Sequence, residues 1–217
     1  MTTCSALRIG IAICCLLPLG VTAQNPSVGN ADVTEAEYEV FSAYIGQSFV
    51  GAIGEDRGGK PISQIVIVNC TESDKDDLDD RLDPDDMPPG GIIENYLRKQ
   101  APSLRAVTIS NFHRANAKQA QLAPRFHLPL HYQLVSAEKI GSILKDDPSS
   151  WTVYYRQYPG AQGHMALSRV GFSPDGKQVL FYVSNWCGGL CASGSYVVME
   201  KHGSAWKVVK EIYMWES

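Results

Sequence analysis

The sequence has few of the features that mark membrane-spanning and nucleic-acid-binding proteins. Its longest apolar run, Ile9 to Leu19, falls well below the roughly 20 residues that a transmembrane helix needs. Lys and Arg together number 19 against 23 Asp and Glu, and they do not gather into the basic surface that nucleic acid requires. We therefore expect no nucleic-acid partner, and no transmembrane segment once the first residues are removed.

Recognised catalytic motifs are also missing. The chain has no Gly-x-Ser-x-Gly, no P-loop, no dinucleotide fingerprint and no His-Glu-x-x-His. None of the five histidines has a nucleophile partner that the sequence reveals, although the members of a triad can be far apart in sequence. We therefore predict no catalytic residue, no cofactor and no cofactor-binding residue. Enzymatic activity is unsupported rather than excluded.

The acidic segment 72–86 is the strongest shift in composition along the chain. It carries nine acidic residues against Lys75 and Arg81. Clustered carboxylates suit calcium, but no glycine lies between Thr71 and Pro89, and the calcium loop of an EF-hand needs one. A solvated acidic loop is therefore favoured over a calcium site.

Two histidines, His127 and His131, are the other metal candidates. Pro129 lies between them and would break a helix that placed them on one face. In a strand they would lie about 13 Å apart, which is too far to share one ion. No metal ligand is predicted.

The first 23 residues have the organisation of a signal peptide. Arg8 precedes the short apolar run, and Val21-Thr22-Ala23 places small residues before a cleavage point. We predict cleavage after Ala23, a flexible leader over residues 24–33, and a single domain over residues 34–217. The predicted location is secreted or periplasmic.

Three cysteines remain after such cleavage, namely Cys70, Cys187 and Cys191. An exported protein meets an oxidising compartment, so a disulfide is expected. Cys187 and Cys191 would close a five-residue loop, and Gly188 and Gly189 permit the tight turn that this ring needs. We predict a structural Cys187–Cys191 disulfide. The alternatives are a labile redox pair, free thiols and pairing with Cys70. Cys70 itself is either an inert buried thiol or bridged.

The pattern of apolar residues places helices first and strands last. Thr34 to Glu37 form a capping box, and apolar residues at helical spacing follow it. A β-branched run predicts a strand over residues 61–70, and residues 104–109 are expected to form another. Four further strands are expected over residues 164–172, 177–184, 195–201 and 206–215. The predicted fold class is α+β, with N-terminal helices packed on a C-terminal four-stranded antiparallel meander.

The C-terminal part of the sequence resembles a family of exported bacterial proteins of unknown function. The resemblance covers roughly residues 150–217, and its cysteine loop departs from the family pattern at Ala192, where a glycine is expected. It supports export and a single domain, and it implies no activity. The residues that carry it are Tyr158-Pro159-Gly160, Ser168 to Phe172, Cys187 to Cys191, Gly194, Tyr196, Glu200-Lys201 and Trp206 to Val208.

The leading functional hypothesis is a non-catalytic binding or interaction module. A loop clamped by a disulfide would present Trp186 and Leu190, and large apolar side chains are costly to display without use. The partner would be a protein or a small ligand. Two alternatives are a cell-envelope hydrolase with a histidine-based site and a secreted inhibitor that acts through its acidic loop.

Overall fold

The computed structural model describes residues 32–50, 59–73, 93–145 and 149–217. The predicted signal peptide, most of the predicted leader and all of the acidic segment beyond Ser73 lie outside these residues. In the part of the chain that is described, no helix is both long and apolar enough to cross a bilayer.

A single mixed sheet forms the centre of the described fold, with strand order β2-β1-β3-β5-β6-β7 and with β4 pairing to β5 off this path. The pairings of β1 with β2 and with β3 are parallel, and those of β3, β4 and β6 with β5 and of β6 with β7 are antiparallel. The strands are β1 (Gln64–Val68), β2 (His131–Val135), β3 (His164–Leu167), β4 (Gly171–Phe172), β5 (Gln178–Gly188), β6 (Cys191–His202) and β7 (Ala205–Glu216).

This sheet corrects the predicted fold class. The expected four-stranded antiparallel meander packed on helices is wrong, because the described sheet has seven strands and is partly parallel. The hairpins β5–β6 and β6–β7 are antiparallel as expected, but β1 and β2 come from distant parts of the chain. A tight turn in the sequence indicates that the two strands it joins pair antiparallel. Parallel strands are joined by long connections, which leave no local pattern in the sequence.

The predicted strand over residues 164–172 is also interrupted. The backbone N–H of Arg169 donates to the side chain of Asn116 (2.7 Å), and that of Val170 donates to the carboxylate of Glu37 (3.2 Å). Side chains therefore satisfy these two backbone donors, and the ladder stops between β3 and β4. The expected strand at residues 104–109 is wrong too, because a helix, α3, begins at Ala106.

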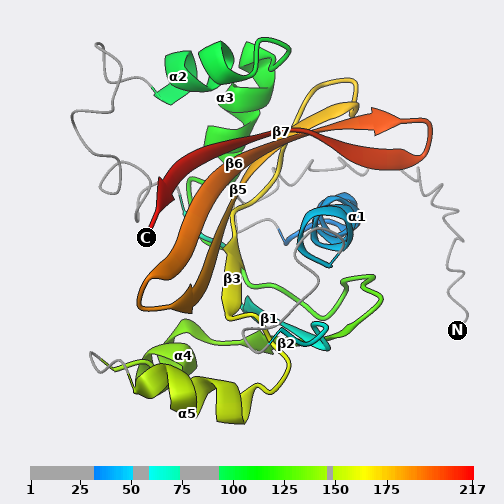
Figure 1. Cartoon of the computed structure of the whole chain (residues 1–217). Coiled ribbons are helices and arrows are strands. Elements are labelled where there is room, and N and C mark those ends of the chain that lie inside the picture. Colours follow the sequence, from blue (N-terminus) through cyan, green and yellow to red (C-terminus); the bar gives the residue numbers. More distant parts are fainter. Residues whose placement is uncertain (1–31, 51–58, 74–92, 146–148) are drawn as a thin grey trace, which may run out of the picture.

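Five α-helices of the described chain flank the sheet. They are α1 (Glu35–Tyr44), which continues as a π-helical stretch (Ile45–Val50), α2 (Ile93–Gln100), α3 (Ala106–Ala115), α4 (Ala137–Ile143) and α5 (Ser150–Gln157). The capping box at Thr34 and Glu37 is confirmed by both of its hydrogen bonds. Figure 1 shows α2 and α3 beside β5–β7, and α4 and α5 near β1 and β2, with α1 on the other side of the sheet.

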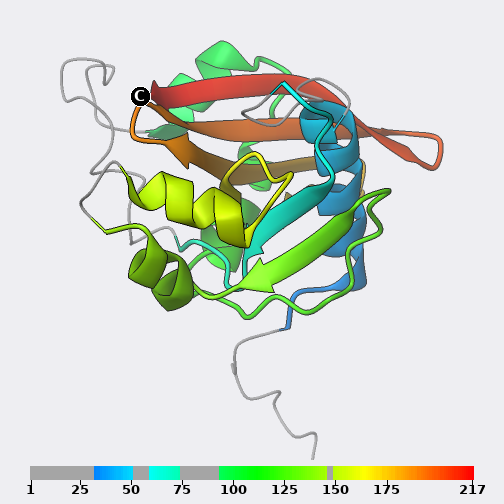
Figure 2. The ribbon, with the colours of Figure 1, turned by 60° about the horizontal axis from the view of Figure 1, so that its bottom comes forward.

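The side chains of β3 show how the layers divide. Met165 and Leu167 point to the core that α1 covers, together with Phe41 and Phe181. His164 and Ala166 alternate with them and face the opposite side of the sheet. On that side α4 and α5 pack at the β1 end, and α2 and α3 pack on β5–β7. In Figure 2, α4 and α5 lie in front of the strands, and α2 and α3 lie behind β5–β7. The middle of this face, over β3 and β5, lies between the two helix pairs.

Candidate ligand pocket

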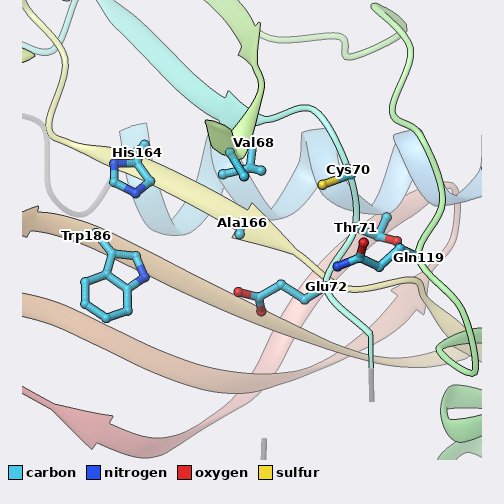
Figure 3. A pocket seen from close by; sticks show the side chains of 9 residues that line it. Val68, Cys70, Thr71, Glu72, Gln119, His164, Ala166 and Trp186 are labelled. Atoms are coloured by element: carbon cyan, nitrogen blue, oxygen red, sulfur yellow. The ribbon is translucent and has the colours of Figure 1, made fainter. Parts of the chain in front are cut away.

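A pocket of about 200 Å³ lies over β3 and β5 on the face opposite α1. Val68 of β1, Ala166 of β3 and Ala137 of α4 give it apolar walls. Figure 3 shows His164 and Trp186 on one side of the pocket and Cys70 on the other, with the side chain of Glu72 extending from below. With Gln119, the lining comes from five separate segments of the sequence.

Small side chains at neighbouring strand positions explain why the space is there. Ala166 of β3 pairs with Ser184 of β5, and both side chains belong to the face opposite α1. The next pair on the same face of the two strands is His164 and Trp186, whose side chains are large. The small side chains of Ala166 and Ser184 therefore leave space over this part of the sheet, and the large rings of His164 and Trp186 border that space on one side. Ala166 and Ser184 are called the floor of the pocket below.

His164 is the least solvated titratable side chain of this wall, with 9% of its surface exposed. Its imidazole stacks on the indole of Trp151 in α5, with the ring centroids 6.0 Å apart and 12° between the planes. Its Nδ1 atom is buried and has no hydrogen-bond partner. Burial lowers the pKa of His164 to about 4, so the ring is neutral at physiological pH.

Glu72 places a carboxylate in the same pocket. The residue continues the line of β1, since its backbone N–H donates to the carbonyl of Leu167 (3.0 Å) and it forms a parallel bridge with Ser168. The buried hydroxyl of Ser184 donates to Oε1 of Glu72 (2.9 Å), which holds the carboxylate over the floor. The charge of Glu72 is thus fixed beside an apolar surface.

The predicted disulfide between Cys187 and Cys191 is confirmed. It closes the turn between β5 and β6, one residue beyond Trp186. The hydroxyl of Tyr155 in α5 donates to the carbonyl of Cys187 (2.9 Å), and Trp186 packs against Trp215 at a centroid distance of 5.1 Å. The wall of the pocket is therefore tied both to α5 and to the end of β7.

The two residues predicted to form an interaction surface point to different environments. Trp186 is half-buried and lines the pocket, whereas Leu190 is 90% exposed at the tip of the disulfide turn. The two residues therefore differ in exposure, and the interaction surface stays a prediction.

Cys70 is a free cysteine at the edge of the pocket. Burial raises the pKa of its thiol, and the negative charges of Glu138 and Glu72 raise it further. The thiol is therefore protonated at neutral pH. A protonated thiol is a weak nucleophile, so Cys70 lacks the environment of a reactive cysteine.

The structure adds no support for a metal site at His127, His131 or the acidic segment 72–86. Over the described ranges, no group of three or more His, Cys, Asp or Glu side chains could hold a metal ion. His127 lies 3.8 Å from Glu35 at the exposed start of α1, and His131 begins β2. The rest of the acidic segment after Ser73 lies outside the described residues.

The sequence did not single out His164, Glu72 or Ala166 as parts of one site. Their proximity depends on the β1–β3 and β3–β5 pairings, and the first of these is parallel. The one available signal was the pair of small residues, Ala166 and Ser184, inside strands that are otherwise bulky and apolar. That signal has meaning only once the two strands are known to be neighbours.

No protein-family model matches the chain, and comparison with curated proteins and with solved structures found no significant match. The resemblance to exported bacterial proteins therefore stays a prediction.

Proposed function

We propose that this protein is a non-catalytic binding protein that holds a small organic molecule in the pocket over β3 and β5. The observation that carries the proposal is the His164 side chain. It is nine-tenths buried in the pocket wall, and its Nδ1 atom has no partner. Buried polar atoms are nearly always hydrogen-bonded, so a site that leaves one without a partner suits a ligand that supplies the missing bond.

The remaining walls support the same function. Ligand sites are concave and mostly apolar, with a few polar groups that fix the orientation of the ligand. Here the apolar surface comes from Val68, Ala166 and Trp186. The polar groups are those of Thr71, Gln119, His164 and Glu72. The stacking on Trp151 and the hydrogen bond from Ser184 hold His164 and Glu72 in place before any ligand arrives.

The structure supports a histidine-based hydrolase less well than a binding protein. A general base works best when its pKa lies near the working pH, and burial lowers the pKa of His164 to about 4. No carboxylate within the described structure hydrogen-bonds to the ring, so it lacks the third group that orients a catalytic imidazole. The protonated thiol of Cys70 offers no activated nucleophile.

Export is part of this proposal. The Cys187–Cys191 disulfide supports it, because disulfides persist in oxidising compartments such as the periplasm and the extracellular space. A binding protein in either compartment would meet its ligand outside the cytoplasm.

The proposal is tested by screening a library of small polar and aromatic molecules with saturation-transfer NMR. Three proteins are compared: the natural protein, Ala166→Leu and Ala117→Leu. Leu at position 166 adds bulk to the pocket floor, whereas Ala117 is exposed and is not among the residues that line the pocket. We expect a set of ligands whose signals vanish with Ala166→Leu and persist with Ala117→Leu. Ligands that bind both variants equally, or no ligand at all, would overturn the proposal.

A further inference from the structure

Three titratable side chains at or beside the pocket are held in their uncharged forms. The imidazole of His164 is a base, and burial lowers its pKa to about 4. The thiol of Cys70 is an acid, and burial raises its pKa, with further contributions from Glu138 and Glu72. Burial also raises the pKa of Tyr154, whose ring lies 5.7 Å from the imidazole between centroids. A base and two acids are thus all shifted toward neutrality, which indicates surroundings that disfavour charge of either sign.

The contacts around His164 give the physical reason. Its ring stacks on the indole of Trp151 and lies against Tyr154, and the side chain is buried. The apolar side chains of Val68 and Ala166 also line the pocket. A charged ligand group placed against the imidazole would lose its hydration, as the imidazolium itself would, so an uncharged group is favoured there.

His164 also determines what kind of uncharged group is suitable. Its Nδ1 atom is buried and has no hydrogen-bond partner. A neutral imidazole presents one N–H donor and one acceptor nitrogen, and a hydroxyl group can bond to either because it both donates and accepts. A carbonyl group only accepts, and an ammonium group only donates. The carboxylate of Glu72, by contrast, already accepts a hydrogen bond from Ser184 (2.9 Å). A hydroxyl group on the ligand therefore suits His164 in either tautomeric form.

The size of the pocket limits the rest of the ligand. A cavity of about 150 Å³ holds a benzene molecule, whereas sites for drug-sized ligands begin at about 300 Å³. At about 200 Å³ the pocket suits a molecule slightly larger than benzene. Such a molecule has room for one compact apolar body and one small polar group.

We infer that the ligand is a small uncharged molecule with a compact apolar body and a hydroxyl group. The hydroxyl group exchanges a hydrogen bond with the imidazole of His164, and the apolar body lies over the floor at Ala166 and against Val68. The ligand class rests on the proposed binding function and refers to the same pocket.

The test uses four probes of nearly equal size. Benzyl alcohol carries a hydroxyl group, and ethylbenzene carries a methyl group in its place. Benzylamine is cationic at neutral pH, and benzoate is anionic. Their dissociation constants are measured by ¹H–¹⁵N and methyl NMR titration of the full chain.

Two variants make the same exchange at different places. His164→Phe keeps an aromatic ring beside Trp151 and removes both ring nitrogens. His202→Phe is the control, because His202 is exposed at the turn between β6 and β7 and is not among the residues that line the pocket. The spectra used for the titrations also show whether each variant is folded.

We expect benzyl alcohol to bind the natural protein about tenfold or more tightly than benzylamine or benzoate, with shifts centred on Ala166 and His164. His164→Phe should raise the dissociation constant of benzyl alcohol relative to that of ethylbenzene by about five- to tenfold, and His202→Phe should leave this ratio unchanged. In the natural protein, the ¹⁵N resonance of His164 Nδ1 should move when benzyl alcohol binds and move much less with ethylbenzene. That measurement does not depend on the folding of a variant.

Benzylamine or benzoate binding in the pocket as tightly as benzyl alcohol would overturn the uncharged ligand class. An unchanged ratio in a folded His164→Phe protein, or equal Nδ1 shifts with benzyl alcohol and ethylbenzene, would overturn the hydroxyl contact. If none of the four probes shifts pocket residues while library molecules do, the ligand class fails as well. The binding function would stand in each case, because it fails only if the library yields no ligand that is lost in Ala166→Leu.

Discussion

The imidazole of His164 lies parallel to the indole of Trp151, with 12° between the ring planes and 6.0 Å between their centroids. The contact joins β3 to α5, and Tyr154 of the same helix lies against the imidazole from another side at 5.7 Å. The histidine of the pocket is thus enclosed by aromatic rings. Two consequences follow: its ring orientation is fixed, and its charged form is disfavoured.

The first prediction concerns stability against pH. Burial lowers the pKa of His164 to about 4 in the folded protein, below the ordinary value near 6.5. As the pH falls through this interval the unfolded chain takes up a proton that the folded chain does not, so the free energy of unfolding declines. Between pH 7 and about pH 4.5 the loss from this residue amounts to about 2–3 kcal/mol.

Urea denaturation at several pH values checks this, with His164→Gln and His202→Gln as paired variants. His202 is exposed, at the turn between β6 and β7. We expect the decline between pH 6.5 and 4 to be smaller in His164→Gln than in the natural protein, and unchanged in His202→Gln. Equal slopes in all three proteins would show that His164 is not buried in its neutral form.

A second prediction concerns the ion pair that joins α1 to the segment between β3 and β4. Arg169 donates from Nε to Oε1 of Glu37 (2.7 Å) and from one terminal nitrogen to Oε2 (2.9 Å), and both side chains are buried. Burial alone would raise the pKa of Glu37, but the hydrogen bonds and charge of Arg169 hold it below its ordinary value. The pair is therefore ionised at neutral pH.

Glu37→Gln removes the carboxylate that pairs with the buried guanidinium of Arg169. Removing one partner of a buried pair costs about 3–5 kcal/mol, so we expect a large drop in the free energy of unfolding at pH 7. Thermal denaturation followed by circular dichroism measures it, with Glu39→Gln on the exposed face of α1 as control. A drop no larger than that of the control would refute the role of the pair.

A third prediction concerns Gly163, which precedes β3 with φ +73°. A Cβ atom at this position would overlap the backbone carbonyl of Trp186, and the left-handed conformation itself disfavours side chains. We expect Gly163→Ala to destabilise the protein by at least about 2 kcal/mol and to displace the Trp186 wall. In the control, Gly141→Ala, the added methyl group meets open space on α4. A Gly163→Ala protein as stable as that control would contradict the close approach.

A fourth prediction concerns the disulfide. A five-residue loop closed by a disulfide stabilises the fold by about 2 kcal/mol on the chain-entropy model. We expect the double variant Cys187→Ser, Cys191→Ser to lose about that amount in urea denaturation and to bind pocket ligands more weakly, since Trp186 directly precedes the turn. Unchanged ligand affinity together with reduced stability would show that the disulfide supports the fold and not the pocket wall.

Local sequence signals predicted part of this fold well. The capping box at Thr34 and the disulfide between Cys187 and Cys191 both depend on residues close together in the chain. The hairpins β5–β6 and β6–β7 are of the same kind, because tight turns join their strands.

The pocket depends on contacts between residues that are far apart in the sequence. Glu72 reaches Ser184 across 112 positions of the sequence, and His164 meets β1 through a parallel pairing. No turn or residue spacing predicts such contacts. From the sequence alone, Glu72 is part of an acidic segment and His164 has no predicted partner, so the two are not recognised as one site. The same applies to Trp186, which was expected at a surface and lies in the pocket wall.

The most direct test of the central claim is to locate a bound molecule. Intermolecular nuclear Overhauser effects are measured between a ligand found in the library screen and the ¹³C-labelled protein. The account predicts contacts from the ligand to the Ala166 methyl group and the Trp186 ring, and their loss in Ala166→Leu. Contacts confined to Leu190 and the disulfide turn, or none to the pocket at saturating concentration, would contradict it.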